Sequence, residues 1–216
     1  MKNAILLAGC LVLSASAAYA QSVGPSSAPD KPSERLLTNM RADFHPKVGT
    51  LTGIKNVQDV DQTQFGPAIP TFRVNLSALQ AYDGKSPVDS LLSPTLLATR
   101  LLRVNGTVES CHVLAKIDGE WTTYRIGAAN RAVAIDRVSQ ILTGKYGANP
   151  NGLFLVESPQ LSLEFLAYRN GGTLMMAWLG YGPGREGLVA GQPMVAESLL
   201  GSLVSAAQSA GGTRAR

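Results

Sequence analysis

The sequence predicts an α+β fold, in which one antiparallel β-sheet is packed by two helices. Residues 97–126 contain three runs rich in β-forming residues, joined by the tight-turn pairs Asn105-Gly106 and Asp118-Gly119. The apolar spacing then changes to the helical period, and further strands and a second helix follow. Strands joined by short turns pair antiparallel, and this order of elements is typical of an α+β domain.

The first twenty residues predict an export signal. Lys2 precedes an apolar run over 4–13, and residues 18–20 have the A-x-A pattern of a signal-peptidase site. We therefore expect cleavage after Ala20 and a soluble periplasmic or secreted product. One alternative stays open, because residues 7–10 have the form of a lipoprotein box, in which Cys10 would carry the lipid.

Residues 21–70 are expected to form a flexible linker followed by an irregular arm. Their first part is rich in Ser, Pro and charge, a short helical turn is predicted at 36–40, and 45–70 shows no clean period. A single domain over 71–210 and a tail over 211–216 complete the expected organisation.

The domain is expected to open with a strand at 72–76 and a short helix that begins at Ser86-Pro87. Pro is favoured in the first turn of a helix, and Pro94 must end this one because its ring cannot sit in a helix interior. The meander 97–126 then comprises strands at 97–104, 107–117 and 120–126. Asn-Gly and Asp-Gly are the preferred pairs for turns whose central residues have positive φ.

The second half of the domain begins with a helix over 128–143. Its apolar residues recur at helical spacing, Arg131 falls on the side turned away from them, and Gly144 is the expected stop. A strand at 153–156, a hairpin over 161–179 and a final helix over 193–210 follow.

The composition of the chain argues against some classes of function. The chain has 216 residues, 45% of them hydrophobic, which suits one packed core. A net charge of +4 without a basic stripe and interleaved aromatics does not predict a nucleic-acid partner. No second apolar run is long enough to span a bilayer, so no membrane span is expected after signal removal.

Cys111 and His112 are neighbours, and a thiol beside an imidazole is a known nucleophile–base arrangement. On a strand, however, adjacent side chains point to opposite faces. Cys111 is therefore expected in the core, with His112 exposed or half-exposed. One cysteine and two histidines in the expected mature chain give no metal-ligand spacing, so no metal site is predicted.

Carboxylates provide a second candidate for catalysis. Glu164 alternates with apolar residues, and it could meet Glu109 and His112 only if their strands were neighbours in the sheet. The hydrolase motifs G-x-S-x-G and S-x-x-K are absent.

A glycine-rich segment follows the last predicted strand. Residues 182–187 match G-x-G-x-x-G, but no βαβ unit can follow, so we expect no nucleotide cofactor. The segment can instead form the lip of a ligand site, and its candidate ligand-binding residues are Tyr181, Gly182, Gly184 and Arg185.

These observations favour an exported, non-catalytic module that binds a protein, a peptide or a component of the bacterial cell envelope. The alternative is an extracytoplasmic hydrolase that uses Cys111 or a carboxylate pair. No cofactor is expected in either case.

Overall fold

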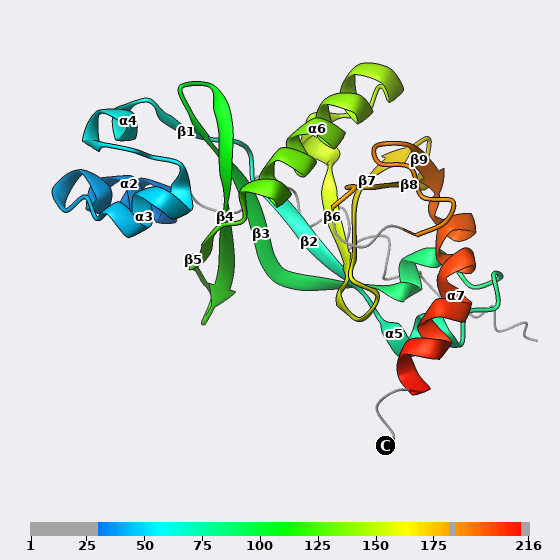
Figure 1. The fold of residues 1–216 in the computed structure, drawn as a ribbon. Coiled ribbons are helices and arrows are strands. Elements are labelled where there is room, and N and C mark those ends of the chain that lie inside the picture. Colours follow the sequence, from blue (N-terminus) through cyan, green and yellow to red (C-terminus); the bar gives the residue numbers. More distant parts are fainter. Residues whose placement is uncertain (1–29, 182–184, 213–216) are drawn as a thin grey trace, which may run out of the picture.

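One large, mostly antiparallel sheet organises the molecule (Figure 1). The computed structural model describes residues 30–181 and 185–212, and within them the sheet has nine strands in the order β5-β4-β3-β2-β6-β7-β8-β9, with β1 paired to β3. The strands are β1 (Thr63–Phe65), β2 (Ile69–Val74), β3 (Leu92–Val104), β4 (Thr107–Ile117), β5 (Glu120–Gly127), β6 (Phe154–Ser158), β7 (Leu163–Asn170), β8 (Thr173–Trp178) and β9 (Pro193–Val195).

Helices and short 3₁₀ turns connect and cover these strands. The α-helices of the described residues are α2 (Lys31–Ala42), α3 (Pro46–Thr52), α4 (Val57–Asp61), α5 (Leu76–Gln80), α6 (Ala129–Tyr146) and α7 (Ala196–Gly212). The 3₁₀ turns are η2 (Val88–Leu91), η3 (Pro150–Gly152) and η4 (Pro159–Leu161). The α+β class predicted from the sequence is confirmed.

A parallel pair joins the two antiparallel parts of the sheet. β2 runs parallel to β6, with Thr71 opposite Leu155, whereas the other paired strands in the described residues are antiparallel. The meander β3–β4–β5 lies on the β2 side of this pair, and β7–β8–β9 lie on the β6 side (Figure 1).

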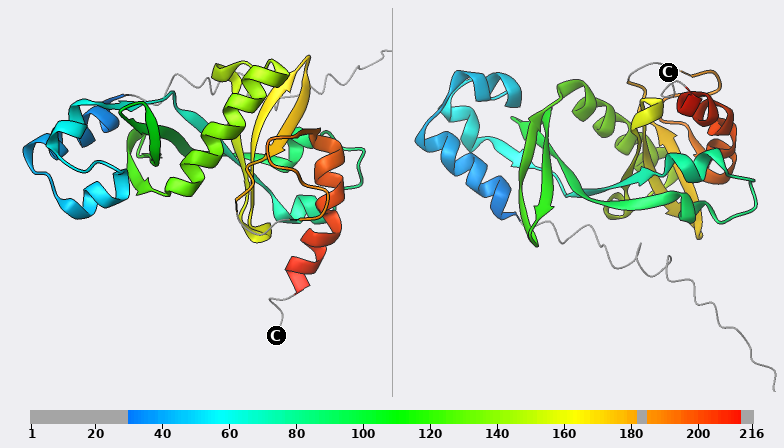
Figure 2. Two further views of the ribbon diagram at one scale, coloured as in Figure 1. Left: turned by 45° about the horizontal axis from the view of Figure 1, so that its top comes forward. Right: turned by 90° about the horizontal axis from the view of Figure 1, so that it is seen from below.

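The two faces of the sheet carry different helices (Figure 2). α6 covers one face, where Ile135 packs with Leu101 and Leu166. On the opposite face, α2–α4 enclose a small cluster around Leu102 near the β5 end, and α5 and α7 cover the other end around Phe165. The alternation of side chains along each strand supplies both faces, as expected of strands buried on two sides.

The predicted tight turns are confirmed in conformation as well as position. Asn105 and Gly106 have φ values of 51° and 79°, and Asp118 and Gly119 have φ values of 51° and 86°. Both central residues of each turn thus take the left-handed region that a type I′ turn requires. This local chemistry sets the register of the meander.

Several element boundaries differ from the prediction. The strand expected at 72–76 is β2, which ends at Val74, and Leu76 begins helix α5. The short helix after Ser86 is the 3₁₀ turn η2, and β3 begins at Leu92. Helix α6 continues past Gly144 and ends at Tyr146, because Gly147 (φ 69°) supplies the left-handed C-cap. The final helix begins at Ala196 rather than 193, since residues 193–195 form β9 beside β8.

The expected irregular arm is the main correction to the fold. In the described part of 21–70, helices α2, α3 and α4 and strand β1 replace it. The side chains of His45 and Asn56 cap the N-termini of α3 and α4 by accepting backbone N–H groups of Lys47 and Asp59. These helices stay on the sheet because their apolar residues pack against Leu102 and Val104 of β3.

Candidate functional site

The Cys111 thiol lies in the core, as the strand alternation predicts. The residue is 1% exposed and belongs to the cluster beneath α6. Burial raises the pKa of the Cys111 thiol. A thiol in this environment stays protonated near neutral pH, and a protonated thiol is a poor nucleophile.

His112 corrects the prediction of an exposed side chain, because it is fully buried. Its face of β4 is covered by the N-terminal segment that was expected to be irregular. Ser33 Oγ of α2 lies 3.1 Å from His112 Nδ1, and Thr123 Oγ1 of β5 lies 2.9 Å from His112 Nε2. The ring of Phe65 packs against the imidazole at a centroid distance of 5.2 Å.

Arg100 completes this buried polar contact. It lies opposite His112 on β3, and its Nε donates to the Gly66 carbonyl at 2.8 Å. Its guanidinium also donates to Asp30 Oδ1 at 2.6 Å and to Ser33 Oγ at 3.3 Å. Burial, and to a smaller extent the charge of Arg100, lowers the pKa of His112 to about 4. The imidazole is therefore neutral at neutral pH.

A serine within hydrogen-bonding distance of a histidine can act as a nucleophile–base pair. Here Ser33 is 2% exposed and His112 is fully buried, so neither presents its reacting atom to solvent. We refer to Ser33, His112, Thr123, Arg100 and Asp30 as the α2 contact. In the present arrangement it fastens α2 to the sheet.

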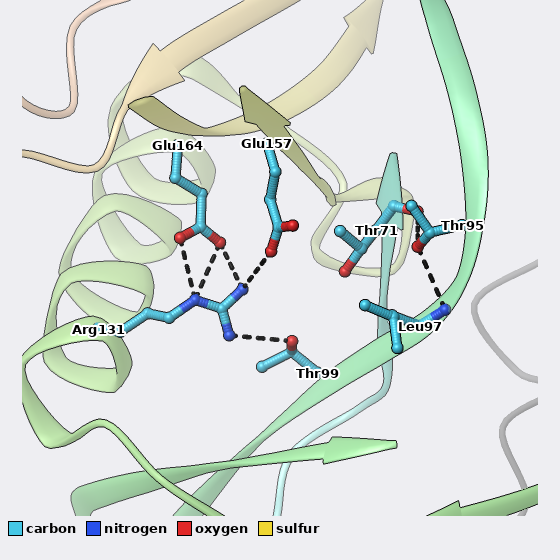
Figure 3. A network of polar contacts seen from close by, with 7 residues as sticks. All are labelled: Thr71, Thr95, Leu97, Thr99, Arg131, Glu157 and Glu164. Atoms are coloured by element: carbon cyan, nitrogen blue, oxygen red, sulfur yellow. Dashed lines mark hydrogen bonds and ion pairs between the residues drawn. The ribbon is translucent and has the colours of Figure 1, made fainter. Parts of the chain in front are cut away.

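Glu164 does not meet Glu109 or His112. β7 and β4 are separated in the sheet by β3, β2 and β6, so the predicted grouping cannot form. Glu164 instead lies directly opposite Glu157 of β6, and Figure 3 shows both carboxylates turned toward Arg131. A carboxylate pair thus exists on this face of the sheet, with a different partner from the one expected.

Arg131 holds this pair together. Its Nε donates to both carboxylate oxygens of Glu164 at 3.0 Å, and its terminal nitrogens reach Glu157 Oε1 at 3.3 Å and Thr99 Oγ1 at 3.2 Å (Figure 3). The residue is 7% exposed, which corrects the prediction that it faces away from the core. The helical pattern could not identify this role, because the partners lie on strands far along the chain.

The electrostatics of the cluster favour an ion pair. Burial raises the pKa of Glu164, and the guanidinium of Arg131 opposes that rise. Because both oxygens of Glu164 already accept from one cation, the carboxylate has limited capacity to take a proton from a substrate. The arrangement ties α6 to β3, β6 and β7.

An open cleft of about 1290 Å³ lies between α2 and the β4–β5 hairpin. Helix α2 contributes Lys31, Glu34, Arg35 and Asn39 to its wall, and the hairpin contributes Lys116, Glu120, Trp121 and Thr123. The indole of Trp121 is half-buried. Thr123 joins this cleft to the α2 contact, because the same residue lines the cleft and bonds His112.

The glycine-rich segment is only partly described. Gly182 and Gly184 lie outside the described residues. Tyr181 is half-buried against the cluster beneath α6, and Arg185 accepts a backbone hydrogen bond from Leu188 through its carbonyl. Neither residue lines the cleft beside α2.

Comparisons with protein-family models, curated proteins and solved structures give no match to this chain. Among the described residues, no group of three or more His, Cys, Asp or Glu side chains is placed to hold a metal ion. No helix within 30–181 or 185–212 has the length and apolar character needed to cross a membrane.

Proposed function

We propose that this chain is an exported, non-catalytic binding module of the bacterial cell envelope and that its ligand lies in the cleft between α2 and the β4–β5 hairpin. The observation that carries the proposal is the cleft itself. It combines a half-buried Trp121 with charged side chains that have no ion-pair partner among the described residues. Tryptophan and arginine, here Trp121 and Arg35, are enriched at binding surfaces.

The charges of the cleft favour an acidic ligand. Lys31, Arg35 and Lys116 are cationic, against the carboxylates Glu34 and Glu120. None of these five side chains makes a salt bridge in the described part of the chain. A ligand carboxylate can therefore gain a charge-assisted hydrogen bond here without breaking an existing ion pair.

The position of β5 favours an extended polypeptide. β5 is the terminal strand of the sheet, so one of its backbone edges has no neighbouring strand among the described residues. A peptide segment can add to such an edge through main-chain hydrogen bonds while its side chains enter the adjacent cleft. The register shift between Val113 and Leu114 leaves Tyr124 as the extra residue of β5, so the edge beside the cleft is regular over the part of β5 before Tyr124.

The test measures binding through Trp121 fluorescence in a Trp178→Phe background, which removes the other tryptophan of the chain. The probe is an acetylated octapeptide of alternating glutamate and valine, and a lysine–valine octapeptide is the charge control. We expect saturable binding of the acidic peptide, and Lys116→Glu should weaken it about tenfold or more because one contact becomes repulsive.

The matched control is Lys85→Glu, which makes the same charge change at an exposed position outside the cleft. It should leave the affinity unchanged. Equal binding of both peptides, or equal weakening by the two substitutions, would contradict a specific acidic-peptide site.

A hydrolase is the less favoured alternative, because its candidate catalytic groups are buried or already paired. The Cys111 thiol is buried beneath α6, and both oxygens of Glu164 are engaged by Arg131. Either group would have to leave its present partners before it could act on a substrate.

A further inference from the structure

The α2 contact lies directly beside the cleft. Its Thr123 forms part of the cleft wall, and its Ser33 belongs to the helix that forms the facing wall. One buried imidazole thus connects the two walls, since Ser33 approaches one ring nitrogen of His112 and Thr123 the other. A change in the protonation of that ring therefore alters the contact that joins the two walls.

We propose that His112 is a proton-sensitive latch that holds α2 on the sheet, and that acid releases α2 and opens the cleft. The proposal rests on the proposed function only for the role of the cleft. The latch itself is a property of the folded chain without ligand.

The neutral ring fits its neighbours in one tautomer. Arg100 donates to Ser33 Oγ at 3.3 Å, so the Ser33 hydroxyl can direct its own hydrogen toward His112 Nδ1. Nδ1 is then the acceptor, and Nε2–H donates to Thr123 Oγ1. Each polar group of the contact has a partner in this arrangement.

A second proton on the ring disrupts this arrangement. Nδ1 becomes a donor, so both it and Arg100 then direct N–H groups at Ser33 Oγ, and the Ser33 hydrogen must turn elsewhere. Two cations would face each other across β3 and β4 in a site where His112 is fully buried. An unpaired buried charge of this kind is expensive.

The charged groups around the ring do not compensate the new cation. Arg100 faces it from β3, and Asp30 at the start of α2 is already paired with Arg100. Phe65 contributes an uncharged ring from β1, and Arg125 of β5 pairs with Val113 on the opposite face of the sheet. One carboxylate that is largely exposed would thus have to serve two cations.

The sign of the pH dependence follows from the two states of α2. With α2 docked, the pKa of His112 is about 4, whereas a released α2 returns the ring to solvent and to its ordinary value near 6.5. Between these values the released state binds more protons, so docking weakens as the pH falls. The contribution of the neutral ring to docking is fully present above pH 6.5 and is lost as the pH falls toward 4, and within this window the opening constant rises up to about tenfold for each pH unit.

Amide hydrogen exchange measured by mass spectrometry tests the latch on the full chain from Gln21, without ligand. Peptides covering 31–42 are compared with peptides from β7 at pH 7 and pH 4.5, after correction for the intrinsic exchange rate. We expect α2 to lose protection on acidification while β7 keeps it. Unchanged protection of α2, or simultaneous loss in both elements, would overturn the proposal.

Two variants separate His112 from other acid effects. His112→Gln keeps a side-chain amide beside Thr123 but cannot be protonated, and its α2 exchange should no longer depend on pH. His45→Gln is the matched control, because His45 is the other histidine and lies exposed at the start of α3. It should respond to acid as the unmodified chain does.

A measurement on the unmodified chain covers the case in which His112→Gln fails to fold. The ring resonances of the two histidines are titrated by NMR together with the backbone amides of α2. Coincident midpoints for His112 and the α2 amides are expected. An His112 ring that titrates near 6.5 while α2 stays docked would overturn the latch, and neither result depends on whether the acidic peptide binds.

Discussion

The guanidinium of Arg131 is surrounded by protein on the face of the sheet beneath α6. It is paired with Glu164 and Glu157 and donates to Thr99. Taking such charges out of water is costly, and only the mutual pairing compensates the cost. Removal of one partner therefore has a larger effect than removal of both.

Arg131→Met should lower the free energy of unfolding by about 3–5 kcal/mol, because Glu164 is left buried without its cation. In the double variant Arg131→Met, Glu164→Leu, most of that loss should be recovered, since the buried pair is replaced by apolar groups. Urea denaturation of the single and double variants measures both values. Simple additivity of the two substitutions would show that they are not coupled through this ion pair.

His112 and Arg131 mark the limit of prediction at this scale. Alternation along β4 correctly assigned Cys111 to one face and His112 to the other, but it could not show that α2 covers the second face. For Arg131, the helical spacing correctly placed the residue away from the apolar row of α6. It wrongly predicted that this side of the helix faces solvent, whereas Arg131 is buried against strands of the sheet. Both errors arise because a periodic pattern does not identify what packs against a face.

Elements whose limits depend on local chemistry were predictable. The meander follows from two type I′ turns, each specified by two adjacent residues. Helices α3 and α4 were missed because each is short, and only 36–40 of α2 were expected to be helical. All three depend on contacts with Leu102 and Val104 far along the chain. The C-terminus of α6 was predictable only to within a few residues, because Gly144 and Gly147 are both possible stop positions.

Those two glycines give a paired test. Gly144 lies inside α6 and Gly147 forms its left-handed C-cap, and an added Cβ would meet no other atom within 4 Å at either position. Gly144→Ala should stabilise the protein by about 0.5–1 kcal/mol. Gly147→Ala should destabilise it by about 1 kcal/mol, because alanine is strained at positive φ.

Thermal and urea unfolding of the two variants measures these shifts. The opposite result, with Gly144→Ala destabilising and Gly147→Ala neutral, would place the end of α6 at the position expected from the sequence.

At the scale of the whole molecule, both ends of the sheet limit uncontrolled pairing. β5 carries a register shift near Tyr124, and β9 has only three residues and begins with Pro193. Short strands, prolines and bulges discourage edge-to-edge aggregation. The regular part of β5 beside the cleft is the segment that remains suited to a specific partner.

Reactivity of Cys111 reports on the integrity of the whole fold. In a chain that begins at Gln21, Cys111 is the one cysteine, and it is buried beneath α6. Alkylation of the native protein, followed by intact mass, should be about a thousandfold slower than alkylation in denaturant, because the thiol reacts only after opening. Rapid native labelling would refute the buried environment and favour the hydrolase alternative.

The parallel pairing of β2 with β6 also has a consequence for how the chain reaches its final form. Thr71 and Leu155 meet across a connection that contains the entire meander and α6. Bringing the ends of so long a connection together costs conformational entropy before the hydrogen bonds between β2 and β6 can offset that cost. We therefore expect the two antiparallel parts to assemble early from neighbouring strands, with their joining as the late, slow event of folding.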